Sequence, residues 1–293
     1  MSERDDLADL VEGEQRNPRD QRGKLGDLAQ RDDRDDQDGK VVSRSRLVLL
    51  PSYQSGEQLL LTVRQALAAW RPVWVVIDGS TDGSARLLDS MRDPALATYE
   101  PGLKVIELPV NAGKGAAVLE GITAALHEGY THVLTMDADG QHPAGWIRQF
   151  MAASAAQPGA MILGSPVFDA SVPLVRLKGR RISNWLANVE IFDAVIDDSL
   201  FGFRVYPIAP LMQIMMGRRG MRRFDFDPEA VVRLCWHGVK PVNLSAPVRY
   251  LSREEGGVSH FNYLRDNVLL AGMHLRLVGG FLIRALIRLL PGS

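Results

Sequence analysis

Two aspartates one residue apart, Asp137 and Asp139, are the side chains of this chain best suited to metal chemistry. They follow the apolar run 132–136, which predicts a short buried strand. Because side chains two apart in a strand point the same way, both carboxylates should project together from its carboxyl end. Carboxylate oxygens suit a hard cation such as Mg²⁺ or Mn²⁺, which in turn suits a diphosphate, and Gln141 and His142 offer two further potential ligands. The sequence predicts a divalent-metal site here, with an acidic loop that binds nothing as the alternative.

Two other loops place nucleotide-binding side chains after predicted strands. Asp78 ends the apolar run 73–77 and precedes a Gly-Ser-Thr-Asp-Gly-Ser loop, where an acid can accept hydrogen bonds from a base or ribose. Lys114 lies between two glycines, after the predicted strand 104–108 and at the start of an amphipathic helix. Its spacing differs from that of a Walker A loop. Either loop alone could be only a capping loop or a helix start.

The order of these segments predicts the architecture that positions them. Short apolar runs alternate with helical patterns, and each polar cluster comes directly after such a run. In an open α/β sheet, ligands bind at the carboxyl edge of the strands. We therefore predict an α/β fold whose sheet brings Asp78, Lys114 and Asp137 to one edge.

Composition divides the chain. The 293 residues are 46% hydrophobic, enough for a substantial core, and a net charge of −1 argues against a nucleic-acid-binding protein. The first 40 residues hold 13 acidic and 8 basic residues and no aromatic residue, which predicts a disordered charged tail. We predict a catalytic domain over residues 41–250. An acceptor loop and a basic, apolar helix are predicted over residues 251–293.

The motifs together resemble family 2 glycosyltransferases of the GT-A fold, a Rossmann-like, mostly parallel mixed sheet flanked by helices. The resemblance rests on Leu-Val-Leu-Leu-Pro-Ser-Tyr at 47–53, Asp-Gly-Ser-Thr-Asp at 78–82, Asn-Ala-Gly-Lys-Gly at 111–115 and the Asp-Ala-Asp at 137–139. Segments 198–204, 224–227 and 253–260 are similar to the branch that contains dolichyl-phosphate and polyprenyl-phosphate mannose synthases. The resemblance covers roughly residues 44–270.

The resemblance implies how a nucleotide-sugar donor would be held. Asp78 would contact the base, with Pro51 and Tyr53 lining the same pocket and Lys114 meeting the nucleotide. Asp137, Asp139 and Gln141 would hold Mg²⁺ or Mn²⁺ on the donor diphosphate.

The resemblance also implies an acceptor side. Arg204 matches the arginine of a Gly-Phe-Arg segment near the acceptor, although it could instead pair with a neighbouring aspartate. Arg253, Ser259 and His260 match a closing segment that contacts phosphate groups.

Two departures from the family reduce the positive charge expected around an acceptor phosphate. Pro166 follows Gly-Ser where the family usually has arginine, and His260 replaces the customary lysine. The cluster of Arg176, Lys178 and two further arginines is either a compensation or a solvated helix face.

The C-terminal segment combines large apolar residues with four arginines, namely Arg265, Arg276, Arg284 and Arg288. A continuous helix would gather these arginines in a sector of about 140°, near anionic headgroups if the helix rests on a membrane. The glycine pair 279–280 is a point at which that helix could break. The alternative is a helix packed on the core or between two copies in a homo-oligomer.

Three features of the sequence bear on where in the cell the protein is located. The charged N-terminus does not resemble a signal peptide, and no uncharged run approaches about 18 residues. A single cysteine, Cys235, fits a reducing compartment. We therefore expect the protein to lie in the cytoplasm or peripherally on the inner face of the cytoplasmic membrane.

The predicted reaction is inverting transfer of a hexose from a nucleotide sugar to polyprenyl phosphate. A phosphate acceptor brings its own negative charge, whereas a hydroxyl acceptor, such as an aryl polyene lipid, needs a general base. Asp225 or Asp227 is the candidate base, and strand alternation would direct only one of them inward; both could also be acids at a helix N-terminus. Alternatives of another class are a nucleotidyltransferase and a catalytically silent sugar-nucleotide-binding protein.

Overall fold

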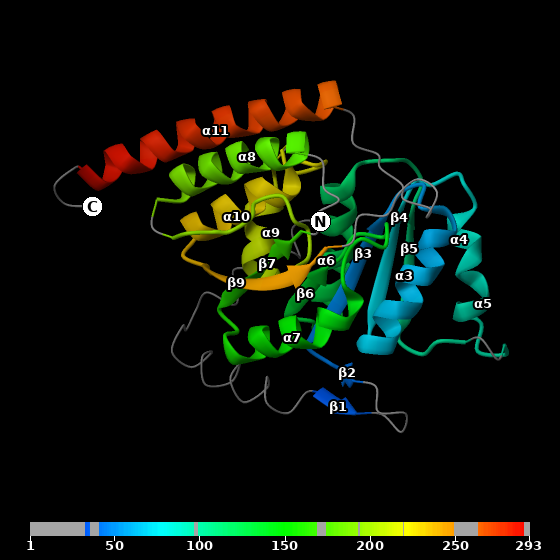
Figure 1. The fold of residues 1–293 in the computed structure, drawn as a ribbon. Coiled ribbons are helices and arrows are strands. Elements are labelled where there is room, and N and C mark those ends of the chain that lie inside the picture. Colours follow the sequence, from blue (N-terminus) through cyan, green and yellow to red (C-terminus); the bar gives the residue numbers. More distant parts are fainter. Residues whose placement is uncertain are drawn as a thin grey trace, which may run out of the picture.

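The computed structural model describes residues 33–35, 41–96, 99–168, 174–192, 194–218, 220–248 and 263–289. Most of the predicted tail, residues 1–32 and 36–40, therefore lies outside the described residues. Residues 33–35 form a strand that pairs antiparallel with the strand at 41–43. This small sheet lies at the bottom of the view in Figure 1.

Within the described residues, seven strands form one sheet in the order β5-β4-β3-β6-β8-β7-β9. Neighbouring strands are parallel except β8, which is antiparallel to both β6 and β7. The strands, including the small sheet, are β1 (Asp33–Asp35), β2 (Val41–Ser43), β3 (Arg46–Ser52), β4 (Val73–Asp78), β5 (Leu103–Leu108), β6 (His132–Thr135), β7 (Ala160–Val167), β8 (Arg204–Pro207) and β9 (Lys240–Pro247).

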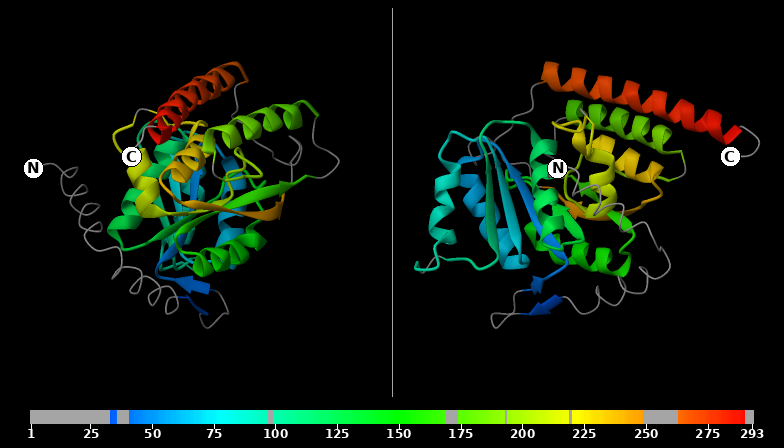
Figure 2. Two further views of the ribbon diagram at one scale, coloured as in Figure 1. Left: turned by 90° about the vertical axis from the view of Figure 1, so that its left-hand side faces the viewer. Right: turned by 180° about the vertical axis from the view of Figure 1, so that it is seen from behind.

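Helices cover both faces of this sheet (Figures 1 and 2). They are α3 (Gly56–Ala69), α4 (Ser84–Leu87), α5 (Asp89–Arg92), α6 (Lys114–His127), the 3₁₀ turn η2 (Ala144–Trp146), α7 (Ile147–Ala156), α8 (Leu174–Ile191), α9 (Ile208–Met215), α10 (Phe226–Trp236) and α11 (Tyr263–Leu289). The predicted strands at 73–77, 104–108 and 132–136 and the helix after Lys114 are therefore present. The mostly parallel α/β architecture predicted from the sequence is confirmed.

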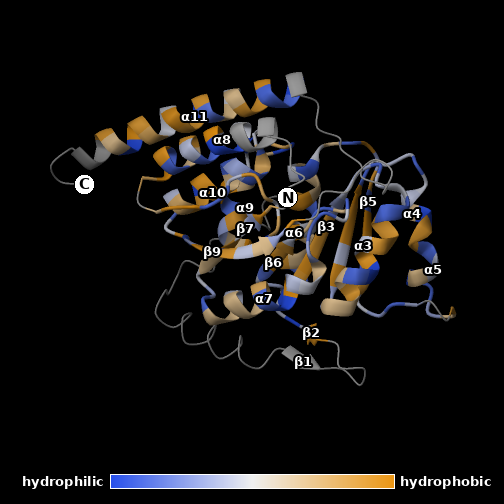
Figure 3. Ribbon diagram, viewed as in Figure 1, coloured by the Kyte–Doolittle hydropathy of each residue, from blue (hydrophilic) through white to orange (hydrophobic). Residues whose placement is uncertain are grey.

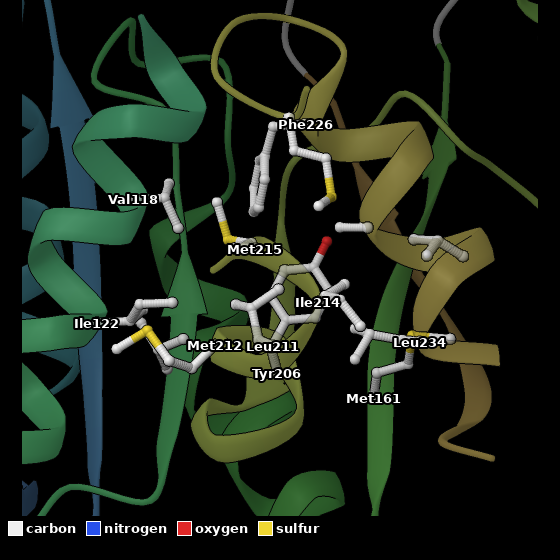
Figure 4. Close-up of a cluster of buried hydrophobic side chains, with 14 of the residues drawn as sticks. Val118, Ile122, Met161, Tyr206, Leu211, Met212, Ile214, Met215, Phe226 and Leu234 are labelled. Atoms are coloured by element: carbon white, nitrogen blue, oxygen red, sulfur yellow. The ribbon is translucent and has the colours of Figure 1, made fainter. Parts of the chain in front are cut away.

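A separate apolar core fills each side of the sheet. Helices α3 and α7 pack on one side over residues such as Leu50, Val75 and Phe150. Helices α6, α9 and α10 pack on the other, where Figure 4 shows Val118 and Ile122 of α6 facing the side chains of α9 and α10. The central strands are buried along their whole length, as expected for parallel strands covered on both faces. Rigid layers on both sides thus fix the strand ends.

Two long helices, α8 and α11, form an additional layer outside α10 (Figure 1). The ring of Phe192, just after α8, lies 5.8 Å from that of Phe281 in α11. Helix α11 runs unbroken through the glycine pair at 279–280, which the sequence had marked as a break point. A Cβ at Gly280 would come 2.9 Å from the ring of Trp236, so this glycine permits close packing on α10.

Candidate nucleotide-sugar site

A cavity of about 420 Å³ opens at the carboxyl ends of β3, β4 and β6. The chain reverses its direction of travel across the sheet between β3 and β6, and such switch points are where ligands bind in open α/β sheets. The lining residues are Pro51, Ser52, Tyr53, Ser55, Asp78, Asn111, Gly113, Lys114, Ala117, Asp137, Ala138, Asp139, Gln141, Arg223, Phe224 and Arg265. Every residue that we predicted to bind the donor or its metal lines this one cavity.

Asp78 joins two of the sequence motifs. Its buried carboxylate accepts hydrogen bonds from the backbone N–H of Ala112 at 2.7 Å and of Gly113 at 2.8 Å. The side-chain amide of Asn111 donates a third, at 3.0 Å. Asp78 therefore shapes the loop that carries Lys114, a structural role that the sequence did not reveal. Its position in the cavity wall is still compatible with contact to a base.

Lys114 bridges two carboxylates. Its Nζ lies 2.6 Å from Oδ1 of Asp137 and 2.7 Å from Oδ2 of Asp227. Burial acts to lower the pKa of Lys114, but the two carboxylates outweigh it and raise that pKa above its ordinary value. Burial likewise acts to raise the pKa of Asp137, and the charge of Lys114 overcomes it, so that pKa is lowered. Within this triad of Lys114, Asp137 and Asp227, Lys114 and Asp137 are thus both charged at neutral pH.

Asp139 lies in the same cavity with a different electrostatic environment. Burial, and then the negative charge of Asp137, raise the pKa of Asp139 to about 7. Its Oδ1 accepts the backbone N–H of Gln141 at 3.0 Å, which closes the turn after β6. Two carboxylates this close destabilise one another's charge, a situation that a divalent cation relieves.

His142 supports the Asp137 loop instead of facing the cavity. Its Nδ1 accepts the backbone N–H of Asp137 at 2.9 Å, and its ring packs edge-on against Phe201 and Phe203. Burial lowers the pKa of His142 to about 4, so the ring is neutral at pH 7. A neutral, packed imidazole fixes the backbone on which Asp137 stands.

The oxygen donors fit a hard divalent cation. Asp137, Asp139 and Gln141 all line one cavity, and Asp137 is ionised. Among the described residues, no group of three or more His, Cys, Asp or Glu side chains gathers closely enough to hold a metal ion. These three residues would therefore share the ion with oxygens of the donor diphosphate, the usual arrangement for Mg²⁺ at phosphate sites.

The two candidate bases have different surroundings, and the strand alternation expected for them is wrong. Asp225 precedes helix α10 and Asp227 lies in its first turn, the helix N-terminus weighed as the alternative. The Asp225 carboxylate accepts the backbone N–H groups of Met221 and Arg223, both at 3.0 Å. Asp227 instead contacts Lys114, and none of the described residues forms a hydrogen bond with its buried Oδ1. Asp227 is therefore the one that belongs to the triad.

Arg204 lies beneath the cavity and does not line it. The side chain is fully buried and donates to the hydroxyl of Tyr206, to the backbone carbonyl of Asp227 at 2.5 Å and to that of Asp198 at 3.2 Å. The predicted role of Arg204 near the acceptor stays a prediction, and its observed contacts are with the backbone and with Tyr206. A guanidinium that holds the backbone of Asp227 is a positioning group.

The structure adds cavity residues that the motifs did not indicate. Arg223 precedes the Phe-Asp-Phe-Asp segment, and Arg265 lies in the first turns of α11. Both bring positive charge to the cavity that holds the metal-site acids, and Phe224 also lines this cavity. The pair Arg222-Arg223 directly before an acidic motif was the available sequence signal, and it was missed.

Several predicted residues cannot be placed. Arg253, Ser259 and His260, the predicted phosphate contacts, lie outside the described residues. The same holds for the side chains of Arg176, Lys178 and Arg288. Their predicted roles remain predictions.

Two arginines of α11 face the protein, whereas the sequence analysis placed them toward a membrane surface. Arg276 donates to Glu229 at 2.9 Å, and Arg284 lies over the ring of Trp236 at 4.9 Å, so both arginines face the protein. The outward face is apolar, with Val268, Leu275 and Leu286 each at least 63% exposed. Residues 265–286 are long enough to cross a membrane and contain an 18-residue window with a mean hydropathy of 1.5, although no uncharged run had suggested a spanning helix.

The fold and the cavity together define a glycosyltransferase of the GT-A class. The profile of glycosyl transferase family 2 matches residues 47–209, more than half of the chain, and the chain belongs to this family. The predicted family and enzyme class are thereby confirmed.

Two curated relatives are similar over most of the chain. Polyprenol monophosphomannose synthase of Mycolicibacterium smegmatis is 28% identical over 218 residues, which cover 72% of this chain and 78% of that protein. Undecaprenyl-phosphate mannosyltransferase of Micrococcus luteus is 24% identical over 216 residues, which cover 72% of this chain and 85% of that protein.

Among solved structures, glucosyl-3-phosphoglycerate synthase of Mycobacterium tuberculosis, in complex with Mn²⁺, UDP-glucose and phosphoglyceric acid, has a TM-score of 0.53. It is 16% identical, and the match covers 89% of this chain and 82% of that one. At this identity the likeness shows the shared GT-A fold.

Proposed function

We propose that this chain is a metal-dependent, inverting hexosyltransferase that uses a nucleoside-diphosphate sugar and polyprenyl phosphate at the inner face of the cytoplasmic membrane. The observation that carries the proposal is the single cavity in which Asp78, Lys114, Asp137 and Asp139 meet. The names of the two curated relatives support a polyprenyl-phosphate acceptor. The single cysteine, Cys235, fits the reducing cytoplasm.

The cavity suits the parts of such a donor. Pro51, Tyr53 and Asp78 are the proposed contacts to the base, and Lys114 and Arg223 bring positive charge to the same cavity, which suits the diphosphate. The divalent ion held by Asp137, Asp139 and Gln141 would stabilise the charge that develops on the departing nucleoside diphosphate.

The metal requirement has a direct test. Asp139→Asn keeps the size of the side chain and its turn, but removes one charge from the cation site. Turnover should fall at least about a hundredfold, which corresponds to the loss of several kcal/mol of transition-state stabilisation. Thermal stability should change little. Near-full turnover of this variant in excess chelator would show that the reaction needs no metal.

A polyprenyl phosphate needs little help from a base, because its second pKa is near 6 and the phosphate is largely dianionic at pH 7. The chain's own part is then to hold the two substrates and exclude water. Arg253, Ser259 and His260 are the proposed contacts to the acceptor phosphate.

The second candidate is transfer to a lipid hydroxyl, and the buried Oδ1 of Asp227, to which no described residue donates, favours it. This oxygen could accept a proton, whereas Asp225 has both oxygens engaged by backbone N–H groups. For a hydroxyl acceptor, Asp227→Asn should abolish turnover while donor affinity stays intact, since a general base contributes typically 10²–10⁴-fold.

One experiment separates these acceptors. The enzyme is incubated with a panel of nucleotide sugars and either a polyprenyl phosphate or the matching free polyprenol, and products are identified by mass spectrometry. The proposal expects a glycosyl phospholipid only from the phosphate, with loss of activity in Arg253→Ala. Product from the free alcohol alone, abolished in Asp227→Asn, would establish the hydroxyl reaction instead.

An outward apolar face supports contact with the lipid surface. At about 100° per residue, Val268, Leu275, Leu282 and Leu286 of α11 fall within about 40° of one another, opposite the buried Leu277. Figure 3 shows apolar residues recurring along this helix.

Helix α8 extends this surface. Ile182 and Trp185 are 62% and 63% exposed, and Phe192, directly after the helix, is 67% exposed. An exposed apolar surface on two adjacent helices indicates an interaction site, and a helix with a polar face toward the protein and an apolar face outward is suited to lie in a membrane surface. Because Arg265 also lines the cavity, the surface and the donor site are joined by α11.

A charge on this face tests the lipid contact. Leu275→Glu should weaken binding to phosphatidylcholine vesicles at least about tenfold, because it removes an exposed apolar side chain whose burial in the lipid would contribute about 1.5–3 kcal/mol. Leu61→Glu is the matched control, since Leu61 is 50% exposed on α3, away from α8 and α11. Unchanged vesicle binding by Leu275→Glu, together with loss of a homodimer in solution, would assign this face to a second copy of the chain.

A further inference from the structure

Lys114 occupies the point at which the donor diphosphate and its metal would meet the protein. It is the first residue of α6, and its side chain is only 12% exposed between Asp137 and Asp227. A Cβ at Gly202 would lie 2.6 Å from its Nζ, 3.3 Å from Oδ1 of Asp227 and 3.4 Å from Oδ2 of Asp137. The absence of a side chain at Gly202 thus leaves room for the ammonium and both carboxylates.

We propose that Lys114 is the built-in counter-ion of Asp137, which keeps metal affinity low until a nucleoside diphosphate arrives and so couples metal binding to donor binding. The inference rests on the proposed function and concerns the order in which this site fills. It assigns Lys114 a role in positioning and coupling in addition to contact with the donor.

The argument begins with the charge on Asp137. One of its oxygens is in an ion pair with Lys114 at 2.6 Å, so a divalent cation that binds this carboxylate would sit within a few ångströms of a second positive charge. Like charges at such a separation repel strongly when water is largely excluded. The cation must therefore either displace Lys114 or bind weakly.

A diphosphate removes this conflict. Its negative charges offset both the cation and the ammonium, and its oxygens can take the place of Asp137 as partners of Lys114. Asp227 keeps the ammonium in the site during this exchange, because its own position is fixed: Arg204 holds its backbone carbonyl at 2.5 Å. The buried Oδ1 of Asp227, which has no hydrogen-bond partner in the described part of the chain, can accept a further N–H of Lys114 when Asp137 is withdrawn.

The local fold does not depend on the Lys114 ion pairs. Ala116 donates its backbone N–H to the carbonyl of Arg222 at 3.0 Å. A Cβ at Gly115 would come 2.0 Å from the carbonyl oxygen of Met221, so α6 and this loop already pack backbone to backbone. A lysine that only tied these segments together would be redundant, and its replacement should leave a folded protein.

The test is Lys114→Met in the full chain, which keeps the length of the side chain and removes its charge. Mn²⁺ binding is measured by electron paramagnetic resonance without nucleotide and with UDP or GDP, and nucleotide binding is measured by calorimetry with and without Mn²⁺. Lys104→Met is the matched control, because Lys104 is an exposed lysine paired with Glu128.

In the wild type, UDP or GDP should tighten Mn²⁺ binding, and Mn²⁺ should tighten nucleotide binding by the same factor. In Lys114→Met, Mn²⁺ alone should bind at least about tenfold more tightly, nucleotide should bind at least about tenfold more weakly, and the coupling factor should shrink. Changes of opposite sign for the two ligands distinguish a counter-ion from a structural lysine, whose loss would weaken both.

Unchanged or weaker binding of Mn²⁺ alone in Lys114→Met, with Lys104→Met like the wild type, overturns the inference and leaves the proposed function standing. Wild-type protein that binds no nucleoside diphosphate in the presence of Mn²⁺ overturns both.

Discussion

Asp78 is expected to be as important for the shape of the donor site as for any contact with a base. Its carboxylate accepts two backbone N–H groups and one side-chain amide from residues 111–113, and it is 2% exposed. Asp78→Asn preserves shape but converts one acceptor oxygen into an N–H donor. At least one backbone N–H of this loop then faces another donor in a buried position.

The magnitude follows from these bonds. A hydrogen bond to a charged group contributes about 1.5–3 kcal/mol to stability, and a buried donor left unsatisfied costs about 1–3 kcal/mol. The two values describe partly the same loss, so they are not added in full. We expect Asp78→Asn to lower the free energy of unfolding by about 2–4 kcal/mol, a large share of the about 5–15 kcal/mol typical of a domain. Asn111→Ala keeps both backbone N–H bonds to the Asp78 carboxylate and removes the side-chain bonds of Asn111 to Asp78 and Arg223, so it should cost less, about 1.5 kcal/mol.

Urea denaturation and calorimetric titration with UDP and GDP measure the two consequences. Nucleotide affinity should fall together with stability, because the loop that Asp78 holds also carries Lys114. Asp82→Asn is the matched control: its carboxylate accepts the N–H groups of Gly56 and Ser84 but is exposed, so it should cost less than about 1 kcal/mol. An Asp78→Asn variant as stable as Asp82→Asn would refute the loop argument, and selective loss of nucleotide affinity would then show that Asp78 acts by direct contact.

Two further predictions concern the site and the pH dependence of stability. Gly202→Ala would place a methyl group 2.6 Å from Nζ of Lys114 and should lower turnover at least about tenfold. Gly145→Ala is the control, because a Cβ at Gly145 would meet nothing within 4 Å, and its turnover should be unchanged. Equal turnover of the two variants would contradict the steric argument. Burial, and then the charge of Arg46, lower the pKa of His132 to about 4, so the folded state favours the neutral ring. His132 should therefore make stability fall as the pH drops below its unfolded pKa near 6.5, by about 2 kcal/mol between pH 7.5 and pH 5, and His132→Gln should reduce the measured dependence by this amount, while the contributions of His142 and Asp139 stay the same in both proteins. Parallel pH profiles for the two proteins would exclude His132 as the cause.

The sequence by itself determined the fold class and the edge of the sheet that carries the chemistry. Apolar runs such as 73–77 and 132–136 are too short for core helices and are typical of buried strands, and polar clusters directly after such strands lie at the carboxyl edge of a parallel sheet. Asp78, Lys114 and Asp137 were therefore predictable as neighbours, because strand ends are positioned by local patterns that repeat along the chain.

Only the tertiary structure decided how these groups are engaged. Asp78 accepts hydrogen bonds from a loop more than 30 residues further along the chain. Of the two candidate bases, Asp227 is the one that pairs with Lys114, and the buried Arg204 donates to its backbone carbonyl. Such pairings depend on segments that approach one another only after folding, so neither periodicity nor spacing records them.

The face that α11 turns outward is the second feature that only packing decided. Its sequence offers both an arginine sector and an apolar sector, and either could face the protein. Glu229 and Trp236 of α10 provide partners for Arg276 and Arg284, so the arginines turn inward and Leu275 and its apolar neighbours remain outside. An amphipathic pattern fixes that a helix has two faces, but the partner it packs against determines which of them reaches the surface.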